Sequence, residues 1–321
     1  MNNSLTVQLA CHAMATRFEF VLCGSDEVAL RAAGEEAIRE IRRIESKFSF
    51  YNPTSVISKL NARAGYESVR TDPETFHFIQ QASLLSKETN STFDPTIAPL
   101  MRAWGLIRNS DTPPDHKKIE EAKNLTGMSR VILDESDGSV RYETPGMQID
   151  PGSLGKGYAL DQVALLLKEL GVEHALVHGG TSSVVAWGKP PGEHNEWKVA
   201  VELPEVVSLF KKEFQKTPTR VFALDNQSLS VSAIWGKTAE DNGKTVGHVI
   251  DPRSGKPVES ALLAACITDN ATTADAYSTA MLVMHSEAAA FADEKQAITD
   301  YYIVLANGEI LSSNSYISNY H

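Results

Sequence analysis

The sequence predicts a mixed α+β fold in which mostly antiparallel sheets pack against single helices within one compact unit. Segments that alternate apolar and polar residues come in hairpin-like pairs, and segments with apolar residues three and four apart stand singly between them. The strict alternation of strand and helix that a doubly wound parallel sheet requires is absent. Since no internal repeat or low-complexity linker divides the chain, we expect residues 1–321 to form one domain.

The expected elements follow from apolar spacing, which has a period of two in strands and of three to four in helices. The predicted strands cover residues 5–23 (two strands), 129–134 and 139–143 (a hairpin), 174–187 (a pair), 198–203, 219–224, 227–232, 245–250, 261–267, 300–305 and 309–313. The predicted helices cover residues 26–47, a short stretch within 49–65, 73–88, a short stretch after 108–118, 156–170, 272–284 and 286–294. The apolar, proline-rich segment 92–105 is typical of an ordered loop that lines a site, and residues 205–218 predict a surface insertion.

The composition excludes several classes of protein. A formal net charge of −11 argues against nucleic acid as the main partner, and any phosphate site must therefore supply positive charge locally. Three cysteines, with no C-x-x-C pair, form neither a disulfide framework nor a zinc site. The N-terminal residues lack the pattern of a signal peptide, and no apolar run approaches the roughly 20 residues of a membrane span. We expect a cytoplasmic protein without a membrane span.

Residues 150–161 place three glycines and Lys156 directly before a predicted helix. The free N–H groups at a helix start and a nearby ammonium group attract phosphate. The spacing fits neither a Walker loop nor a dinucleotide fingerprint. A tight turn whose glycines only permit positive φ remains the alternative reading.

Asp275 and Thr279 are four residues apart in a predicted helix and should share one of its faces. A carboxylate beside a hydroxyl offers hard oxygen ligands, which suit Mg²⁺ or Ca²⁺ better than zinc. The alternative is an aspartate near a helix N-terminus that interacts only with the helix dipole.

His248 follows a predicted strand and stands three residues before Asp251 in a turn sequence. A histidine in this place can act as a general base. A plain β-turn with a satisfied histidine is the alternative. A phosphate cradle, a hard-metal pair and a base are together the parts of phosphoryl or nucleotidyl transfer.

Several short sequence blocks, each present once, follow one another along the chain in an order that is typical of one protein family. They are Met14–Thr16, Ser49–Tyr51 with Ser55 and Ile57–Asn61, Phe93–Thr96 with Pro99–Leu100 and Trp104–Gly105, Asp150–Asp161, His178–Gly180, His248–Gly255 and Ala274–Thr279. In this order they resemble the ApbE-type flavin transferases, the FAD:protein FMN transferases, which implies an ApbE/T-fold-like architecture. The chain departs from the family pattern at Ala15, Pro151, Gly155, Thr181 and Ala233, and we expect these departures to bear on cofactor affinity and acceptor selectivity more than on the fold.

The resemblance implies Mg²⁺-dependent transfer of FMN from FAD to a Thr or Ser hydroxyl of a partner flavoprotein, with a phosphoester bond formed and AMP released. It implies metal ligation by the carbonyl groups of Gly155 and Ser278 and by the side chains of Asp275 and Thr279. His248 would be the base, and Asp251 would orient the loop or the histidine. The implied FAD contacts are Met14, Tyr51, Asp94, Thr96, Ser153, Lys156, Gly157, Asp161, Gly179, Gly180 and Ser232. The aromatic residues that could stack on the isoalloxazine ring are Tyr51, Trp104 and Trp235.

Two other functions share these motifs. A Mg²⁺-dependent FAD pyrophosphatase would use water as the nucleophile and release FMN and AMP without an acceptor. A non-catalytic FAD-binding protein would keep its FAD intact in the presence of Mg²⁺. The sequence does not separate the transferase from the hydrolase, and it leaves the acceptor protein and the oligomeric state open.

Overall fold

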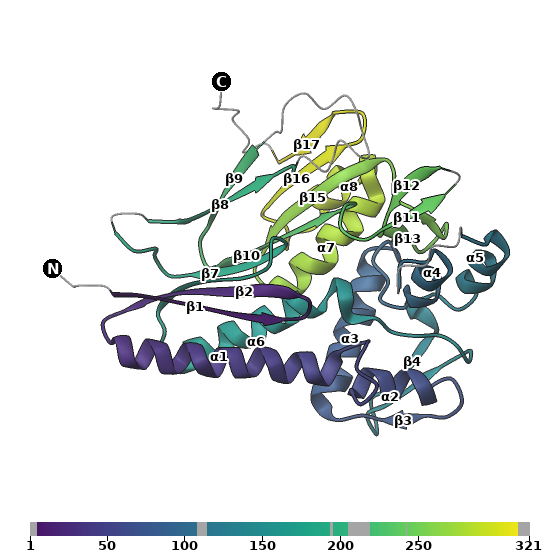
Figure 1. The fold of residues 1–321 in the computed structure, drawn as a ribbon, viewed down its shortest axis with the longest axis horizontal. Coiled ribbons are helices and arrows are strands. Elements are labelled where there is room, and N and C mark those ends of the chain that lie inside the picture. Colours follow the sequence, from purple (N-terminus) through teal and green to yellow (C-terminus); the bar gives the residue numbers. More distant parts are fainter. Residues whose placement is uncertain (1–4, 108–113, 193–194, 205–218, 242, 314–321) are drawn as a thin grey trace.

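An eight-stranded antiparallel sheet forms the centre of the structure, a computed structural model that describes residues 5–107, 114–192, 195–204, 219–241 and 243–313 (Figure 1). Its strands lie in the order β1 (Leu5–Ala13), β2 (Thr16–Gly24), β6 (His174–Gly179), β7 (Ser183–Trp187), β10 (Gln227–Ala233), β15 (Ala261–Thr268), β16 (Asp300–Leu305) and β17 (Ile310–Ser312). The sheet brings strands from the two ends of the described chain into one layer.

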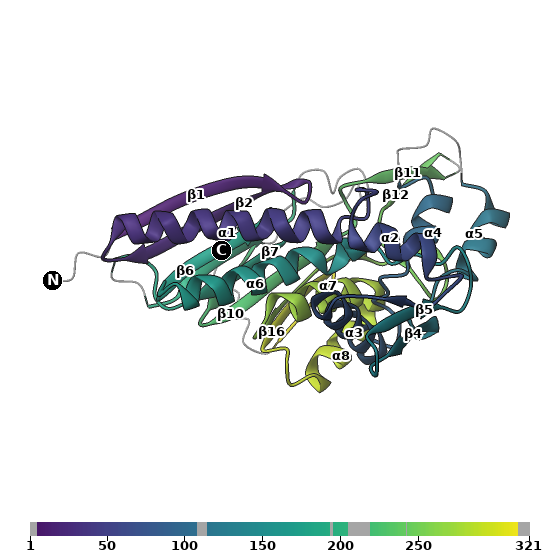
Figure 2. The same ribbon diagram turned by 90° about the horizontal axis from the view of Figure 1, so that it is seen from below.

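Three helices cover one face of this sheet: α1 (Glu27–Phe48), α6 (Gly155–Glu169) and α7 (Ala271–Met284) (Figure 2). In α1 the buried residues recur every three or four positions, which is the spacing of one helical face. Asp26 caps this helix by accepting hydrogen bonds from the backbone N–H groups of Val28 and Ala29. Nearly every residue of α7 is buried, because the helix lies between the sheet and its neighbouring helices.

Smaller elements complete the fold. The further helices are α2 (Val56–Arg63), α3 (Pro73–Glu88), α4 (Ala98–Ala103), α5 (His116–Lys123) and α8 (Ala288–Glu294). The further strands are β3 (Val69–Arg70), β4 (Val131–Asp134) and β5 (Ser139–Tyr142) in one small sheet, and the pairs β8 (Trp197–Glu202) with β9 (Thr219–Leu224), β11 (Thr238–Asp241) with β12 (Lys244–Gly247), and β13 (Ile250–Asp251) with β14 (Lys256–Pro257). Within the described part of the chain, no helix has the length and apolar character needed to cross a bilayer.

The predicted fold class is confirmed, since the described sheets are antiparallel and a layer of three helices packs against the large one. Two expectations need correction. The predicted strand 245–250 is broken at His248, which leaves the two short strands β12 and β13. The segment 92–105 is an ordered loop as predicted, but it also contains the helix α4. The predicted insertion at residues 205–218 lies outside the described residues.

Candidate active site

A cavity of about 1030 Å³ lies between the central sheet and the segments that follow α1, α3 and β12. This volume stands at the upper end of ordinary small-molecule sites, which span about 300–1000 Å³. The predicted site residues that line it are Met14, Tyr51, Asp94, Ser153, Lys156, Ser232, His248, Asp275 and Thr279. The predicted residues that do not line it are Thr96, Gly155, Gly157, Asp161, Gly179, Gly180, Asp251 and Ser278.

Asp275 is a buried carboxylate that three elements hold in place. It is 3% exposed and lies in the second turn of α7, at the wall of the cavity. Its Oδ1 accepts hydrogen bonds from the hydroxyls of Ser183 (3.1 Å) and Ser230 (2.8 Å), and its Oδ2 accepts one from the backbone N–H of Gly157 (3.0 Å). A carboxylate has about four lone-pair positions, so one remains for a further ligand.

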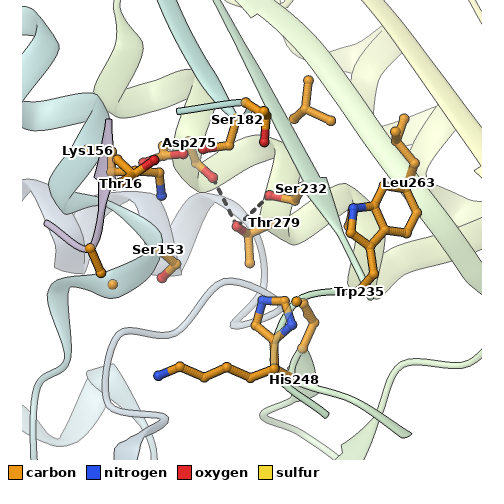
Figure 3. A pocket seen from close by; sticks show the side chains of 18 of the residues that line it. Thr16, Ser153, Lys156, Ser182, Ser232, Trp235, His248, Leu263, Asp275 and Thr279 are labelled. Carbon is orange, nitrogen blue, oxygen red and sulfur yellow. Dashed lines mark hydrogen bonds between the residues drawn. The ribbon is translucent and has the colours of Figure 1, made fainter. Parts of the chain in front are cut away.

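Thr279 lies one helical turn after Asp275, as the spacing predicts. Its hydroxyl donates to the backbone carbonyl of Asp275 (3.0 Å) and lies 3.0 Å from the hydroxyl of Ser232 on β10 (Figure 3). The Ser232 hydroxyl also lies 2.9 Å from that of Ser278, which is fully buried behind it. The sheet and α7 therefore present a group of hydroxyls and one carboxylate to the cavity.

This donor set fits a hard cation. Among the described residues, no group of three or more His, Cys, Asp or Glu side chains could hold a metal, and Asp275 has no ion-pair partner there. Mg²⁺ is commonly held by one or two carboxylates together with the phosphates of a substrate. Asp275 and Thr279 fit that pattern, whereas Gly155 and Ser278 do not line the cavity.

His248 lies on the cavity wall between β12 and β13 (Figure 3). Its Nδ1 atom is buried without a hydrogen-bond partner. Burial lowers the pKa of the imidazole below its usual value, and the positive charges of Lys237 and Lys156 lower it further. His248 is therefore neutral at neutral pH, which is the form that can accept a proton.

Asp251 contacts Arg253 and not His248. Its carboxylate accepts hydrogen bonds from the Arg253 backbone N–H (2.9 Å), Nε (3.0 Å) and Nη2 (3.2 Å). Asp251 was expected either to orient the loop or to orient His248, and its contact with Arg253 fits the first role. Within the described residues, no hydrogen bond joins Asp251 to His248.

The comparisons with known proteins identify the family of the chain. The model of the ApbE family matches residues 14–303. The chain belongs to the ApbE family. A FAD:protein FMN transferase from Klebsiella pneumoniae is 28% identical over 305 residues, which cover 92% of this chain and 91% of that protein. A FAD:protein FMN transferase from Haemophilus influenzae is 26% identical over 301 residues, covering 90% and 85%.

Solved structures of ApbE proteins have the same fold. The crystal structure of the ApbE protein from Thermotoga maritima matches with a TM-score of 0.85 at 27% identity, and the match covers 97% of each chain. The flavin transferase ApbE from Vibrio cholerae matches with a TM-score of 0.81 at 20% identity, again over 97% of each chain, a likeness that concerns the fold alone. The family resemblance inferred from the sequence blocks is thus confirmed.

Of the three glycines at the start of α6 in this ApbE chain, Gly157 serves close packing between helices. Gly152, Gly155 and Gly157 all have negative φ, so the turn does not need glycine for its backbone conformation. A Cβ atom on Gly157 would lie 2.2 Å from the carbonyl oxygen of Ala271, so α6 can approach α7 only without a side chain there. The N-cap residue of α6, Leu154, provides no side-chain hydrogen bond, and Lys156 lines the cavity beside this helix start.

Asp161 is directed to α7 and not to the cavity. Its carboxylate accepts hydrogen bonds from the backbone N–H groups of Ala271 (2.7 Å) and Thr272 (2.8 Å) and from the Thr272 hydroxyl. Burial raises the pKa of this carboxyl group. In this structure the Asp161 carboxylate thus binds the first turn of α7, and its expected contact with FAD stays a prediction.

Asp94 and Thr96 stabilise the loop that forms one wall. Asp94 accepts hydrogen bonds from the Thr96 N–H (2.8 Å), the Thr96 hydroxyl (2.5 Å) and the Met128 N–H (2.8 Å). Burial raises the pKa of Asp94. Trp104 is buried, and its indole donates to the carbonyl of Gly255 (2.8 Å), so it does not line the cavity as Tyr51 and Trp235 do.

Hydrogen bonds from α2 and from the loop at Pro95 hold the turn from Asp150 to Ser153 in place. Asn61 on α2 holds the preceding residue, since its amide donates to the carbonyl of Ile149 and accepts from the Ile149 N–H, each at 2.9 Å. The N–H of Asp150 donates to the carbonyl of Pro95 (2.7 Å), and its carboxylate caps the turn at Gly152. These contacts fix Ser153 at the cavity wall.

Gly179 and Gly180 leave space for close packing at the turn between β6 and β7. Gly180 has φ +69°, and a Cβ atom there would lie 2.2 Å from the Thr16 hydroxyl. The two glycines let this turn approach the β1–β2 turn. The residues that reach the cavity are the neighbouring Thr181 and Ser182.

Several site residues were missed by sequence reasoning. Ser183 and Ser230, which hold Asp275, stand at fully buried positions of β7 and β10, and a serine at a core-facing position of a strand was the available signal. Thr16 and Lys237, which also line the cavity, carried no comparable pattern.

Proposed function

We propose that the protein transfers FMN from FAD to a Thr or Ser hydroxyl of an acceptor flavoprotein and releases AMP. The observation that carries the proposal is that Asp275, Thr279, Lys156 and His248 all line the same cavity. Relatives named FAD:protein FMN transferases, which match most of the chain, support the choice of substrates. The enzyme class follows from the same relatives together with membership of the ApbE family.

The proposed ligands for Mg²⁺ are the carboxylate of Asp275 and the hydroxyl of Thr279. When bound there, the ion would act as a Lewis acid and neutralise charge on the phosphate oxygens of FAD. Ser183, Ser230 and the Gly157 N–H keep the Asp275 carboxylate in one orientation. This preorganisation lets the carboxylate meet a ligand without rearranging.

The remaining residues supply charge and proton transfer. Lys156 and the start of α6 attract the pyrophosphate. The acceptor hydroxyl loses its proton to the neutral imidazole of His248, a bond forms between the hydroxyl oxygen and the FMN phosphorus, and the bond from that phosphorus to the AMP oxygen breaks. AMP leaves with the electron pair of that bond.

The test is incubation of the protein with FAD, Mg²⁺ and a panel of flavoprotein fragments, followed by mass spectrometry of each fragment and quantification of AMP. The proposal predicts one fragment that gains FMN in equal amount to the AMP released, and none when EDTA is present. A fragment whose candidate Thr or Ser is replaced by Ala is the matched control and should stay unmodified. Free FMN and AMP without a modified fragment would identify a hydrolase, and intact FAD would identify a binding protein.

A further inference from the structure

Lys237 is a cation at the cavity whose hydrogen-bond partner is uncharged, and its charge also acts on the lining carboxylate of Asp150. It lies in the exposed segment between β10 and β11 and lines the cavity together with Tyr51. Its Nζ donates a hydrogen bond to the Tyr51 hydroxyl (3.2 Å) and lies 5.3 Å from the centre of the Tyr51 ring. No carboxylate within the described residues forms an ion pair with it.

The cavity is lined by more carboxylates than lysines, so the ammonium group of Lys237 is one of few local positive charges. The lining carboxylates are Asp94, Asp150, Glu202 and Asp275, and the lining lysines are Lys156 and Lys237. A dinucleotide brings two more negative charges on its pyrophosphate. A site with this excess of carboxylates needs local cations to bind such a ligand, because unpaired charges of one sign repel each other strongly where water is partly excluded.

The contact with Tyr51 is easily exchanged for another. It joins two exposed side chains across segments 186 residues apart in sequence, and it involves a neutral hydroxyl. A lysine ammonium has three donors on a flexible stem and forms stronger hydrogen bonds to an anion than to a neutral oxygen. A phosphate oxygen would therefore replace the phenol as its partner.

We propose that Lys237 binds a phosphate group of the dinucleotide substrate and leaves Tyr51 when the substrate enters. The inference rests on the proposed function, since it concerns a ligand of the same cavity. Lys156 and Lys237 then approach the pyrophosphate from two separate segments of the chain, and Tyr51 holds Lys237 at the cavity before binding.

The position of Lys237 also connects it with His248. The preceding residue, Gly236, has φ +124°, and a Cβ atom on it would lie 3.3 Å from Cε1 of His248. The segment that carries Lys237 thus packs against the imidazole. The charged groups that act on His248 are Lys237 and Lys156, and both lower its pKa.

The first test compares binding of FAD and of riboflavin, which lacks phosphate, to the Lys237→Gln and Lys237→Arg variants by flavin fluorescence titration. Lys237→Gln should weaken FAD binding about tenfold or more, as expected for loss of a charge-assisted hydrogen bond, and should leave riboflavin binding unchanged. Lys237→Arg should restore most of the FAD affinity. Unchanged FAD binding in Lys237→Gln, or equal weakening of both ligands, would overturn the inference.

The matched control is Lys295→Gln. Lys295 also lies over an aromatic ring, 5.5 Å from the centre of Phe291, but does not line the cavity. Its replacement should change neither affinity. Tyr51→Phe, which removes the hydroxyl and keeps the ring, removes the phenol that competes with phosphate for Lys237, so the ratio of FAD affinity to riboflavin affinity should rise. A lower ratio in Tyr51→Phe would contradict the exchange of partners.

A pH profile gives a second readout. Loss of the Lys237 charge should raise the pKa of His248, so the acidic limb of kcat/KM should move to higher pH in Lys237→Gln. An unmoved limb would contradict the placement of Lys237 beside the imidazole. The binding titration needs no acceptor or turnover, which separates the two proposals. Transfer to an acceptor with normal FAD binding in Lys237→Gln removes this inference alone, whereas Lys237-dependent binding without transfer removes the proposed function alone.

Discussion

The backbone N–H of Gly157 donates a hydrogen bond to Oδ2 of Asp275 at 3.0 Å, although the two residues are 118 positions apart. The bond joins the start of α6 to the second turn of α7. It forms because Gly157 has no side chain to keep its backbone away from Ala271. The packing of two helices thereby orients the one carboxylate that we propose as a metal ligand.

The Gly157→Ala variant should be destabilised. A methyl group there would meet backbone atoms, which cannot move aside as a flexible side chain can. Overpacking of this kind typically costs about 1–3 kcal/mol in the free energy of unfolding. Urea denaturation measures it. Gly155→Ala is the control, because its Cβ would lie an ordinary 3.6 Å from Pro151, and a loss as large as that of Gly157→Ala would contradict the account.

Asp275→Asn should lower Mg²⁺-dependent turnover about 100-fold or more, because the help of a Lewis acid is worth several kcal/mol. The fold should persist with a modest loss of stability, since asparagine can still accept the hydroxyl hydrogen bonds of Ser183 and Ser230 but its amide nitrogen cannot accept the one from the Gly157 N–H. Steady-state rates across a Mg²⁺ titration measure the effect. Asp161→Asn is the matched control, a second buried carboxylate beside α7. It should lower stability but keep the same Mg²⁺ dependence, and a lost Mg²⁺ response in this control would remove the assignment to Asp275.

His248→Gln should lower turnover about 100-fold or more, the usual contribution of a general base, with little change in FAD affinity. In the unchanged protein the lowered pKa keeps the imidazole neutral at neutral pH and below. The value of kcat/KM should therefore stay level as the pH falls through about 6.5, the usual histidine pKa, and should decline only at lower pH as the ring gains its proton. A decline that begins above that pH, or normal turnover in His248→Gln, would exclude His248 as the base.

Glu45→Ala should loosen the β1–β2 turn. Oε1 of Glu45 accepts a hydrogen bond from the N–H of Met14 (2.5 Å), and Met14 and Ala15 both hold positive φ, at 50° and 59°. We expect a loss of about 1 kcal/mol in unfolding free energy and a higher KM for FAD, because both turn residues line the cavity. Glu45→Gln, which keeps an acceptor, should behave as the unchanged protein.

The Ala15→Gly variant tests whether the positive φ of Ala15 destabilises the β1–β2 turn. Glycine adopts positive φ without steric cost, so this variant should gain about 0.5–1 kcal/mol in unfolding free energy. A destabilised Ala15→Gly variant would show that the turn carries no backbone strain. Thermal or urea unfolding of the variants at positions 15 and 45, singly and combined, gives the measurement.

Local pattern predicted the elements well. The helix Pro73–Glu88 has both ends where they were expected, because Asp72 caps it and proline occupies its first position. The shared face of Asp275 and Thr279 followed from a spacing of four. The short strands β11 and β13 were not separable by periodicity, since two to four residues are too few to show a period.

Partnerships between distant residues were not predictable. The family resemblance placed Asp161 among the FAD contacts, and no sequence pattern pointed to its partners Ala271 and Thr272, which lie 110 and 111 positions further along the chain. Both readings of the glycines at the start of α6 missed the packing role of Gly157, because that role depends on which helix lies opposite. A single sequence predicts the apolar faces of helices and the residues of turns, but it does not predict which residues of two helices come into contact.

The most direct test of the central claim is a crystal structure of the protein with FAD and Mn²⁺, a Mg²⁺ substitute that anomalous scattering locates. The account predicts an ion about 2.0–2.2 Å from oxygen atoms of Asp275 and Thr279 and in contact with the FAD pyrophosphate. An ion bound elsewhere, or FAD bound with its phosphates away from these two residues, would contradict it.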